Sequence, residues 1–371
     1  AGGLQLAGVG AVGEVNLDSR DLLGPLDAES GNIFISNASL DTGRNGGDIN
    51  IAANQLTLEN GTYIKSGMEN DSGGDIFIKA NELIMNSGPS IYWNSIITGS
   101  SGTGDAGDIN IDVVGKIELN EGLISASSEN GSGGNIFIRA SELSINQGPD
   151  VLMARIETGG GIGIGDAGNV NIDVEDTIEL NGGTISASSG SGSSGEIAMS
   201  ASTILFDDGA KILTDTLATG EGGDISIQSD FLGIYNGSVI SSETRGTGNG
   251  GDIKITAENI DLQNDVQIAS ISTGQGNAGN INIEAISDLN IEGSQITTKA
   301  LHANGGNISL NAGSMTWLRD STVTATVLGG TQTSGGNIEF KSKYVILNTS
   351  RIVANAFEGQ GGNIDIFADV Y

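Results

Sequence analysis

The chain has 371 residues, with 60 glycines, three prolines and no cysteine, and its 46 acidic and 15 basic residues give a formal net charge of -31. Phosphate recognition needs clustered Lys and Arg, so this balance argues against nucleic acid and against anionic membrane surfaces as partners. The lack of cysteine excludes disulfides, thiolate metal sites and cysteine nucleophiles. No apolar run is long enough to span a bilayer, so direct membrane insertion is not expected.

Residues 1–45 differ from the rest of the chain because they lack its regular spacing. Gly31-Asn32-Ile33 resembles the phrase that recurs later, but it stands only sixteen residues before the next copy. An atypical terminal coil is what a repeat protein needs to cover its open edge. We therefore predict that 1–45 forms an N-terminal coil or cap.

From residue 46 onward, a phrase of two glycines, an acid or amide, isoleucine, any residue and a second apolar residue recurs to the end of the chain. Full copies begin at Gly46, Gly73, Gly133, Gly222, Gly250, Gly305, Gly335 and Gly361, and variants surround Gly107, Gly168, Gly195 and Gly279. The second glycine advances by 26 to 34 residues between copies. Such a period is typical of solenoids, whereas a four-stranded propeller blade needs about 40 to 50 residues.

Within one period the apolar residues form three short alternating runs, as in Ile253/Ile255, Ile260/Leu262 and Ile268 with Ile271. Each run has the two-residue period of a strand with one buried face. Stacked coils would bury these faces as one continuous column. The predicted fold is all-β: a right-handed parallel β-helix over 46–371, with three strands per coil of about 27 residues and roughly a dozen coils.

The corner before the first strand of each coil combines glycine with an acid or amide. The glycine pairs are expected to supply positive φ. The next residues should stack between coils, and they are Asp48, Asp75, Asp108, Asn135, Asn169, Glu196, Asp224, Asp252, Asn280, Asn307, Asn337 and Asn363. Stacked asparagines can form an amide ladder. Stacked aspartates should repel each other unless they splay into solvent or share a cation. Diffuse binding of cations such as Ca²⁺ at Asp48, Asp75 and Asp108 is the only metal site considered, and no cofactor is expected.

Residues 74–133 and 134–194 look like tandem copies of one unit of two coils. Each copy has an excess of residues after a Gly-Pro pair, and we predict side bulges near 88–100 and 148–162. Insertions of this kind often build the binding face of a repeat protein.

Two aromatic groups receive separate predictions. Tyr92 and Trp93 in the first bulge form a candidate ligand-binding pair that could stack on a sugar, and the alternative is that one ring covers a local apolar cluster. Trp317, next to Met315 in a second run, is predicted to point into the core.

Parallel β-helices also carry polysaccharide lyases and glycosidases, so acid pairs such as Asp207 and Asp208, or Asp173 with Glu175 and Asp176, were considered. A chain with 46 acids will cluster some of them by chance. Catalysis further needs a defined separation and a shifted pKa, which spacing alone does not provide. His302, the only histidine, is predicted to lie on a surface turn. No catalytic residue is assigned, and an enzyme is not expected.

The repeat resembles the shaft of filamentous haemagglutinin-like large exoproteins, the adhesins exported by two-partner secretion. The matching residues include Gly107-Asp108-Ile109-Asn110-Ile111, followed by Ile117-Glu118-Leu119-Asn120-Glu121-Gly122-Leu123-Ile124-Ser125-Ala126-Ser127. The resemblance covers roughly 31–371, and the acidic, isoleucine-rich repeats are similar to the cyanobacterial type. The family's usual Asn-Pro-Asn-Gly motif is absent, so the chain is either a distal fragment or another surface solenoid with the same coil.

The resemblance implies a secreted protein at the bacterial cell surface that acts as a structural or adhesive rod. Its expected partner is a polysaccharide or protein receptor of the cell surface or matrix. One alternative is a self-assembling fibre or envelope-layer subunit, in which copies join head to tail by β-augmentation. Another alternative is a β-helix that binds or cleaves polysaccharide.

Overall fold

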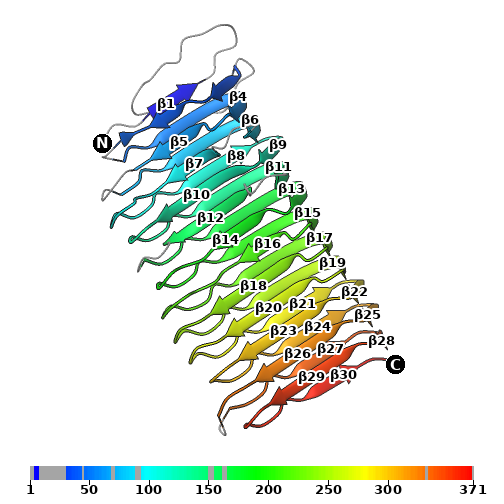
Figure 1. The fold of residues 1–371 in the computed structure, drawn as a ribbon. Helices are drawn as coiled ribbons and strands as arrows, with labels where there is room; N and C mark the ends of the chain where they lie inside the picture. The colour runs from blue at the N-terminus through cyan, green and yellow to red at the C-terminus, as the bar shows by residue number, and fades with distance from the viewer. Residues whose placement is uncertain are drawn as a thin grey trace.

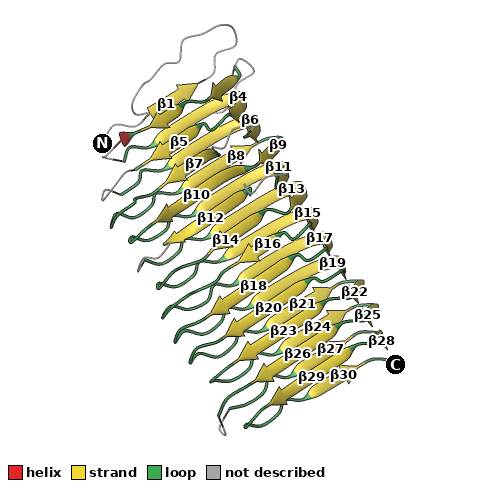
Figure 2. Cartoon of the chain, viewed as in Figure 1, coloured by secondary structure: helices red, strands yellow, loops and turns green. Residues whose placement is uncertain are grey.

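The computed structural model describes residues 4–7, 31–43, 46–67, 72–87, 93–148, 154–160, 165–330 and 333–369. These residues form a parallel β-solenoid of about 11 turns, with about 28 residues per turn and three strands per coil. The rod runs from the N-terminal coil at one end to the C-terminal coil at the other (Figure 1). The described part of the chain consists almost entirely of strands and connecting loops and contains no α-helix; the one short helical segment is a 3₁₀ turn at Gly43 (Figure 2). The predicted fold class is confirmed.

The strands form two sheets of 18 and 12 strands. The larger sheet contains β1 (Leu4–Ala7), β2 (Ile33–Ser36), β4 (Ile49–Glu59), β6 (Ile76–Asn86), β8 (Ile109–Val113), β9 (Lys116–Asn120), β11 (Ile136–Asn146), β13 (Val170–Asn181), β15 (Ile197–Asp207), β17 (Ile225–Tyr235), β19 (Ile253–Gln263), β21 (Ile281–Ala285), β22 (Asp288–Glu292), β24 (Ile308–Ala312), β25 (Met315–Arg319), β27 (Ile338–Lys341), β28 (Tyr344–Asn348) and β30 (Ile364–Phe367). The smaller sheet contains β3 (Ser39–Asp41), β5 (Tyr63–Ser66), β7 (Asn94–Thr98), β10 (Gly122–Ser128), β12 (Arg155–Gly160), β14 (Thr184–Ala187), β16 (Lys211–Leu213), β18 (Val239–Thr244), β20 (Gln267–Ser272), β23 (Gln295–Ala300), β26 (Thr322–Val327) and β29 (Arg351–Ala356).

Equivalent residues of successive coils lie directly over one another. Ile253 of β19 pairs with Ile225 of the coil before it and with Ile281 of the coil after it. In β19 and six other long strands the first two predicted runs form one continuous strand, whereas β21 and β22 keep them separate. All pairings between the named strands are parallel, and the apolar positions stay aligned on both sides of the register shifts in β11–β13 and β13–β15. Each buried apolar side chain therefore covers an apolar side chain of the next coil, and water is excluded from the column.

The third run differs in detail from its prediction. Ile268 is fully buried, but Ile271 is only partly buried, because strand alternation places Ser270 and Ser272 inward instead. The buried hydroxyl of Ser270 donates to the carbonyl of Gly251 at 2.9 Å and accepts the backbone N–H of Gly279 at 3.0 Å. It therefore satisfies the glycine corners of two adjacent coils inside the rod.

Trp317 is not in the core, and this sequence prediction is wrong. In β25 the inward positions belong to Thr316 and Leu318, which are fully buried, and Trp317 is only partly buried on the opposite face. The Arg319 guanidinium lies over the Trp317 ring, 5.5 Å from its centroid. Either of two alternating sets of residues in this strand could have pointed inward. The set that contains Met315 and Trp317 has the larger apolar side chains, but it lies on the outer face.

The glycine pairs serve a different purpose from the one predicted. Among the described pairs only Gly46 has positive φ. The second glycine is instead required by the close approach of neighbouring coils: a Cβ added to Gly134 would lie 2.0 Å from the carbonyl oxygen of Gly107, and one added to Gly223 would lie 1.9 Å from that of Gly195. Real Cβ atoms do not approach other atoms this closely.

The predicted cap supplies strands that stack on the first regular coil. Leu4 of β1 pairs with Ile49 in the first half of β4, and Ile33 of β2 pairs with Leu56 in its second half. Strand β3 pairs with β5 in the other sheet. One complete layer is therefore assembled from two separated pieces of the range 1–45.

The predicted bulges overlap with regular strands. Strands β7 and β12 lie inside the ranges 88–100 and 148–162, and both pair in register with β10 between them. The later part of each range therefore belongs to the wall of the solenoid. Residues 88–92, 149–153 and 161–164 lie outside the described residues. No helix in the described part is long and apolar enough to cross a membrane.

Candidate binding surfaces

The column that begins with Asp48, Asp75 and Asp108 forms a ladder from side chain to backbone. Oδ1 of Asp48 accepts the backbone N–H of Asp75 at 3.0 Å, and Oδ1 of Asp75 accepts that of Asp108 at 2.8 Å. The same bond joins Asn307 to Asn337 and Asn337 to Asn363, each at 2.9 Å. The column stacks as the sequence indicates, but its main bond is to the backbone rather than between amides.

These three aspartates do not converge on a point that would coordinate a cation. In the described ranges no three Asp, Glu or His side chains come together to hold a metal. Burial raises the pKa of the Asp75 carboxyl, and the neighbouring Asp108 and Asp48 charges add to this, while the Asp108 N–H opposes it. Diffuse cation association at Asp48, Asp75 and Asp108 needs no fixed geometry, and it stays a prediction.

Two further ladders were missed in the sequence. One of them runs parallel to the Asp48 ladder, three residues earlier in each coil. In it the backbone N–H groups of Ser132, Ser193 and Asn277 donate to Oδ1 of Asp105, Asp166 and Asn249, respectively, at 2.7 to 2.9 Å. The other is a true amide ladder at the end of the second run, where Asn86, Asn120, Asn146 and Asn181 are joined at 2.8 to 2.9 Å. Its signal in the sequence was the asparagine that follows the second apolar residue of the second run in these four coils. Both ladders add polar bonds that run along the rod.

The predicted ligand pair is only partly described. Tyr92 lies outside the described residues, and Trp93 is partly buried immediately before β7. A sugar platform at Tyr92 and Trp93 therefore stays a prediction.

A different aromatic surface lies on the outer face of β6, β8, β11 and β13, which are adjacent in the rod (Figure 1). Phe137 at its centre keeps 41% of its surface exposed. A groove of about 370 Å³ surrounds it, and its polar walls are Asn110, Asp112, Arg139, Asn171 and Asp173. The sequence contains this signal as the middle residue of Ile136-Phe137-Ile138, which strand alternation must turn outward.

A second groove, of about 380 Å³, lies on the outer face of β12, β14 and the residues after β16. Arg155 pairs with Glu157 at 2.6 Å. Burial raises the pKa of Asp215 to about 6, and the nearby Glu243 carboxylate also raises it, while hydrogen bonds from the Glu243 N–H and the Ser241 hydroxyl oppose the shift. The groove therefore holds two carboxyl groups in different environments: Asp215, whose pKa is about 6, and Glu157, which forms an ion pair with Arg155. Enzymes that use acid–base chemistry often place two carboxyl groups in different environments.

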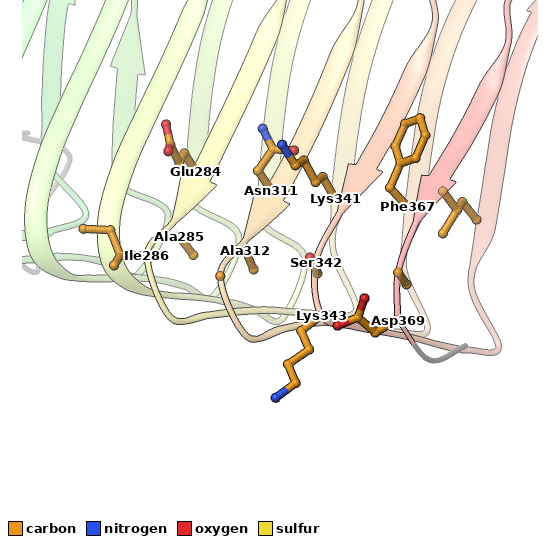
Figure 3. Close-up of a pocket in the computed structure, with 13 residues that line it drawn as sticks. Glu284, Ala285, Ile286, Asn311, Ala312, Lys341, Ser342, Lys343, Phe367 and Asp369 are labelled. Atoms are coloured by element: carbon orange, nitrogen blue, oxygen red, sulfur yellow. The ribbon is translucent and has the colours of Figure 1, made fainter.

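A third groove, of about 920 Å³, lies beside the last described coils (Figure 3). Glu284, Lys341, Lys343 and Asp369 bring both charge signs to its walls, and the 56% exposed Phe367 is the one aromatic residue among the described residues that line it. The residues stacked on Phe367 in the two coils before it are Lys341 and Asn311, so the ring is not repeated along the rod. We therefore assign no ligand to this groove.

Asp173 and Asp207, two of the acids considered as catalytic residues, form bonds that have a structural role. Asp173 forms an ion pair with Arg139 at 3.7 Å. Oδ1 of Asp207 accepts the Asn236 side-chain amide and the backbone N–H of Asp208, both at 2.7 Å. His302 is exposed on its turn, where the sequence places it. The bonds of Asp173 and Asp207 join strands and turns of the solenoid.

The chain was compared with family models, with curated proteins and with solved structures. No family model, curated protein or solved structure matches the chain.

Proposed function

We propose that this chain is a structural and adhesive rod on the outside of a bacterial cell, and that it works without catalysis. The proposal includes the relationship to the filamentous haemagglutinin-like exoproteins that the repeat phrase resembles. It places the chain among secreted proteins whose role depends on length, stiffness and a repetitive surface. A carbohydrate or protein receptor of the cell surface or matrix would be its partner.

The single observation that carries this proposal is the unbroken stacking of coils along the described solenoid. Each coil rises by about 4.8 Å, so about 11 turns give a rod roughly 50 Å long. Neighbouring coils share an apolar layer, and most of them are also joined by ladder bonds such as those from Asp224 to Asp252 and from Asp252 to Asn280. Solenoid stability grows with such interfaces. A rod of this kind is suited to hold a binding surface away from a cell.

Two measurements test the proposal. An antibody raised against the chain should label intact source cells without permeabilisation, and electron microscopy of the purified chain should show single rods. Labelling that requires permeabilised cells would overturn the location. Continuous filaments would instead support head-to-tail assembly. New reducing ends after incubation with polysaccharides would support cleavage, with the Asp215 groove as the first place to mutate.

A further inference from the structure

We propose that the outer face of β6, β8, β11 and β13 binds a linear, neutral, β-linked polysaccharide that lies along the rod axis. This inference rests on the proposed adhesive function and deepens it, because it names the binding face and the chemical class of the ligand. We call this face the aromatic strip and define it by Phe77, Asn110, Phe137 and Asn171, together with Lys79, Asp112, Arg139 and Asp173.

The first column of the strip alternates between aromatic rings and amides. Phe77 pairs with Asn110, Asn110 with Phe137, and Phe137 with Asn171, in exact strand register. This alternation follows from the tandem copies of the two-coil unit. The two rings are therefore separated by two coils, or about 10 Å along the axis.

This spacing favours a polymer over a single sugar. In an extended β-1,4-linked chain successive rings are flipped, so equivalent faces recur at every second ring. A chain lying along the rod would present one apolar sugar face to Phe77 and the equivalent face, one disaccharide further along, to Phe137. Aromatic rings bury apolar surface while neighbouring polar groups hold the hydroxyls, which is the usual division of work in such sites.

The groove at Phe137 supplies both kinds of contact. The ring is 41% exposed although it lies in the middle of a sheet face. Asn110 and Asn171 flank it on the neighbouring strands and line the same groove of about 370 Å³. Each amide carries donors and an acceptor, so it can bind sugar hydroxyls on either side of the ring.

The second column argues that the ligand is neutral. Along it, Lys79 pairs with Asp112, Asp112 with Arg139, and Arg139 with Asp173, so the two signs alternate. Two basic and two acidic side chains cancel, and Arg139 Nε lies 3.7 Å from an oxygen of Asp173. An acidic polysaccharide would meet these carboxylates and a chain with a net charge of -31. A neutral one keeps the Arg139–Asp173 ion pair intact and meets no repulsion.

Calorimetric titration of the purified chain with cellohexaose and with chitohexaose tests the proposal. At least one of the two should bind, and Phe137→Thr should weaken that binding at least tenfold. Phe77→Thr should weaken it too, whereas Phe137→Tyr, which keeps the ring, should retain it. Phe357→Ala is the control, because Phe357 is 77% exposed but lies off the strip, after β29. Circular dichroism verifies that each variant keeps its sheet.

Three results would overturn the inference: neither hexasaccharide binds, Phe137→Thr binds as well as the unchanged chain, or Phe357→Ala loses binding to the same degree. Tighter binding of an acidic polysaccharide such as alginate would also refute it. None of these outcomes changes the surface labelling or the rods seen by microscopy, so the inference can fail while the proposed function stands.

Discussion

Gly195 stacks so closely on Gly168 that a Cβ added to Gly195 would lie 1.8 Å from the Gly168 carbonyl oxygen. Because the obstructing atom belongs to the backbone, Gly195→Ala must push two coils apart. We expect a loss of roughly 1 to 3 kcal/mol in the free energy of unfolding, the usual cost of overpacking. Urea denaturation followed by circular dichroism measures it.

Gly361→Ala is the control for this substitution. It is the first glycine of its pair, and an added Cβ would meet only the Ala354 carbonyl oxygen, at the ordinary distance of 3.4 Å. The control should leave the denaturation midpoint nearly unchanged. Equal losses in both variants would mean that the pairs are needed for a reason other than close approach.

The ladder at the glycine corners should contribute measurably to stability. Asn307 accepts the backbone N–H of Asn337 through its side-chain oxygen at 2.9 Å. Asn307→Ala removes that acceptor and should cost about 1 kcal/mol, the net value of such a hydrogen bond. Asn307→Asp retains an acceptor, as Asp48 and Asp252 do in their coils, and should cost less in thermal denaturation. If the alanine and aspartate variants have the same melting temperature, the ladder hydrogen bond makes no net contribution to stability.

The sequence predicts the coil well because its signals are repeated in every layer. Ile253, Ile255, Ile260, Leu262 and Ile268 are all buried, as their spacing indicates. The reason for the glycines could not be predicted, since positive φ and close backbone approach both require the same residue. The two explanations are distinguished by the backbone angles and by the distance between stacked coils, and the spacing of residues in the sequence gives neither.

The candidate site was harder to predict than the fold. Outward positions carry no periodic apolar signal, so Phe137 was passed over although its neighbours Ile136 and Ile138 determine that it points outward. Trp317 failed for a related reason. A strand shifted by one residue exchanges its two faces, and large apolar residues at Met315 and Trp317 favoured the wrong one.

The outward position of Trp317 leads to a paired prediction. Leu318→Ala removes a fully buried side chain and should cost about 2 to 5 kcal/mol. Trp317→Thr keeps a residue that suits a strand and gives up mainly the contact with Arg319, so it should cost about 1 kcal/mol or less. Urea denaturation of both variants checks this. A larger loss for Trp317→Thr than for Leu318→Ala would place the tryptophan in the core after all.

Asp215 should make the stability of the rod depend on pH in a defined window. Its pKa is about 6 in the folded chain, where burial and Glu243 raise it from the ordinary value of 3.8. The folded state therefore binds the proton more tightly than the unfolded state does. The stabilisation that protonation provides is fully present below pH 4 and is lost as the pH rises through 6, by an amount of about 3 kcal/mol.

Asp215→Asn should remove this loss, because the amide cannot ionise and its oxygen can still accept the Glu243 N–H, which lies 3.0 Å from Oδ1 in the folded chain. We expect the variant to be more stable than the unchanged chain above pH 6 and about equal to it below pH 4. Asp230→Asn, at an exposed position on β17, changes the net charge equally and serves as the control. Denaturation midpoints measured from pH 4 to 8 give the comparison, and a parallel shift of both variants at every pH would assign the effect to overall charge. A stability difference that only Asp215→Asn shows, and that grows from pH 4 to 6 and persists above pH 6, would assign the titration to Asp215 in the groove beside Glu157, because Asp215 loses its proton in that range.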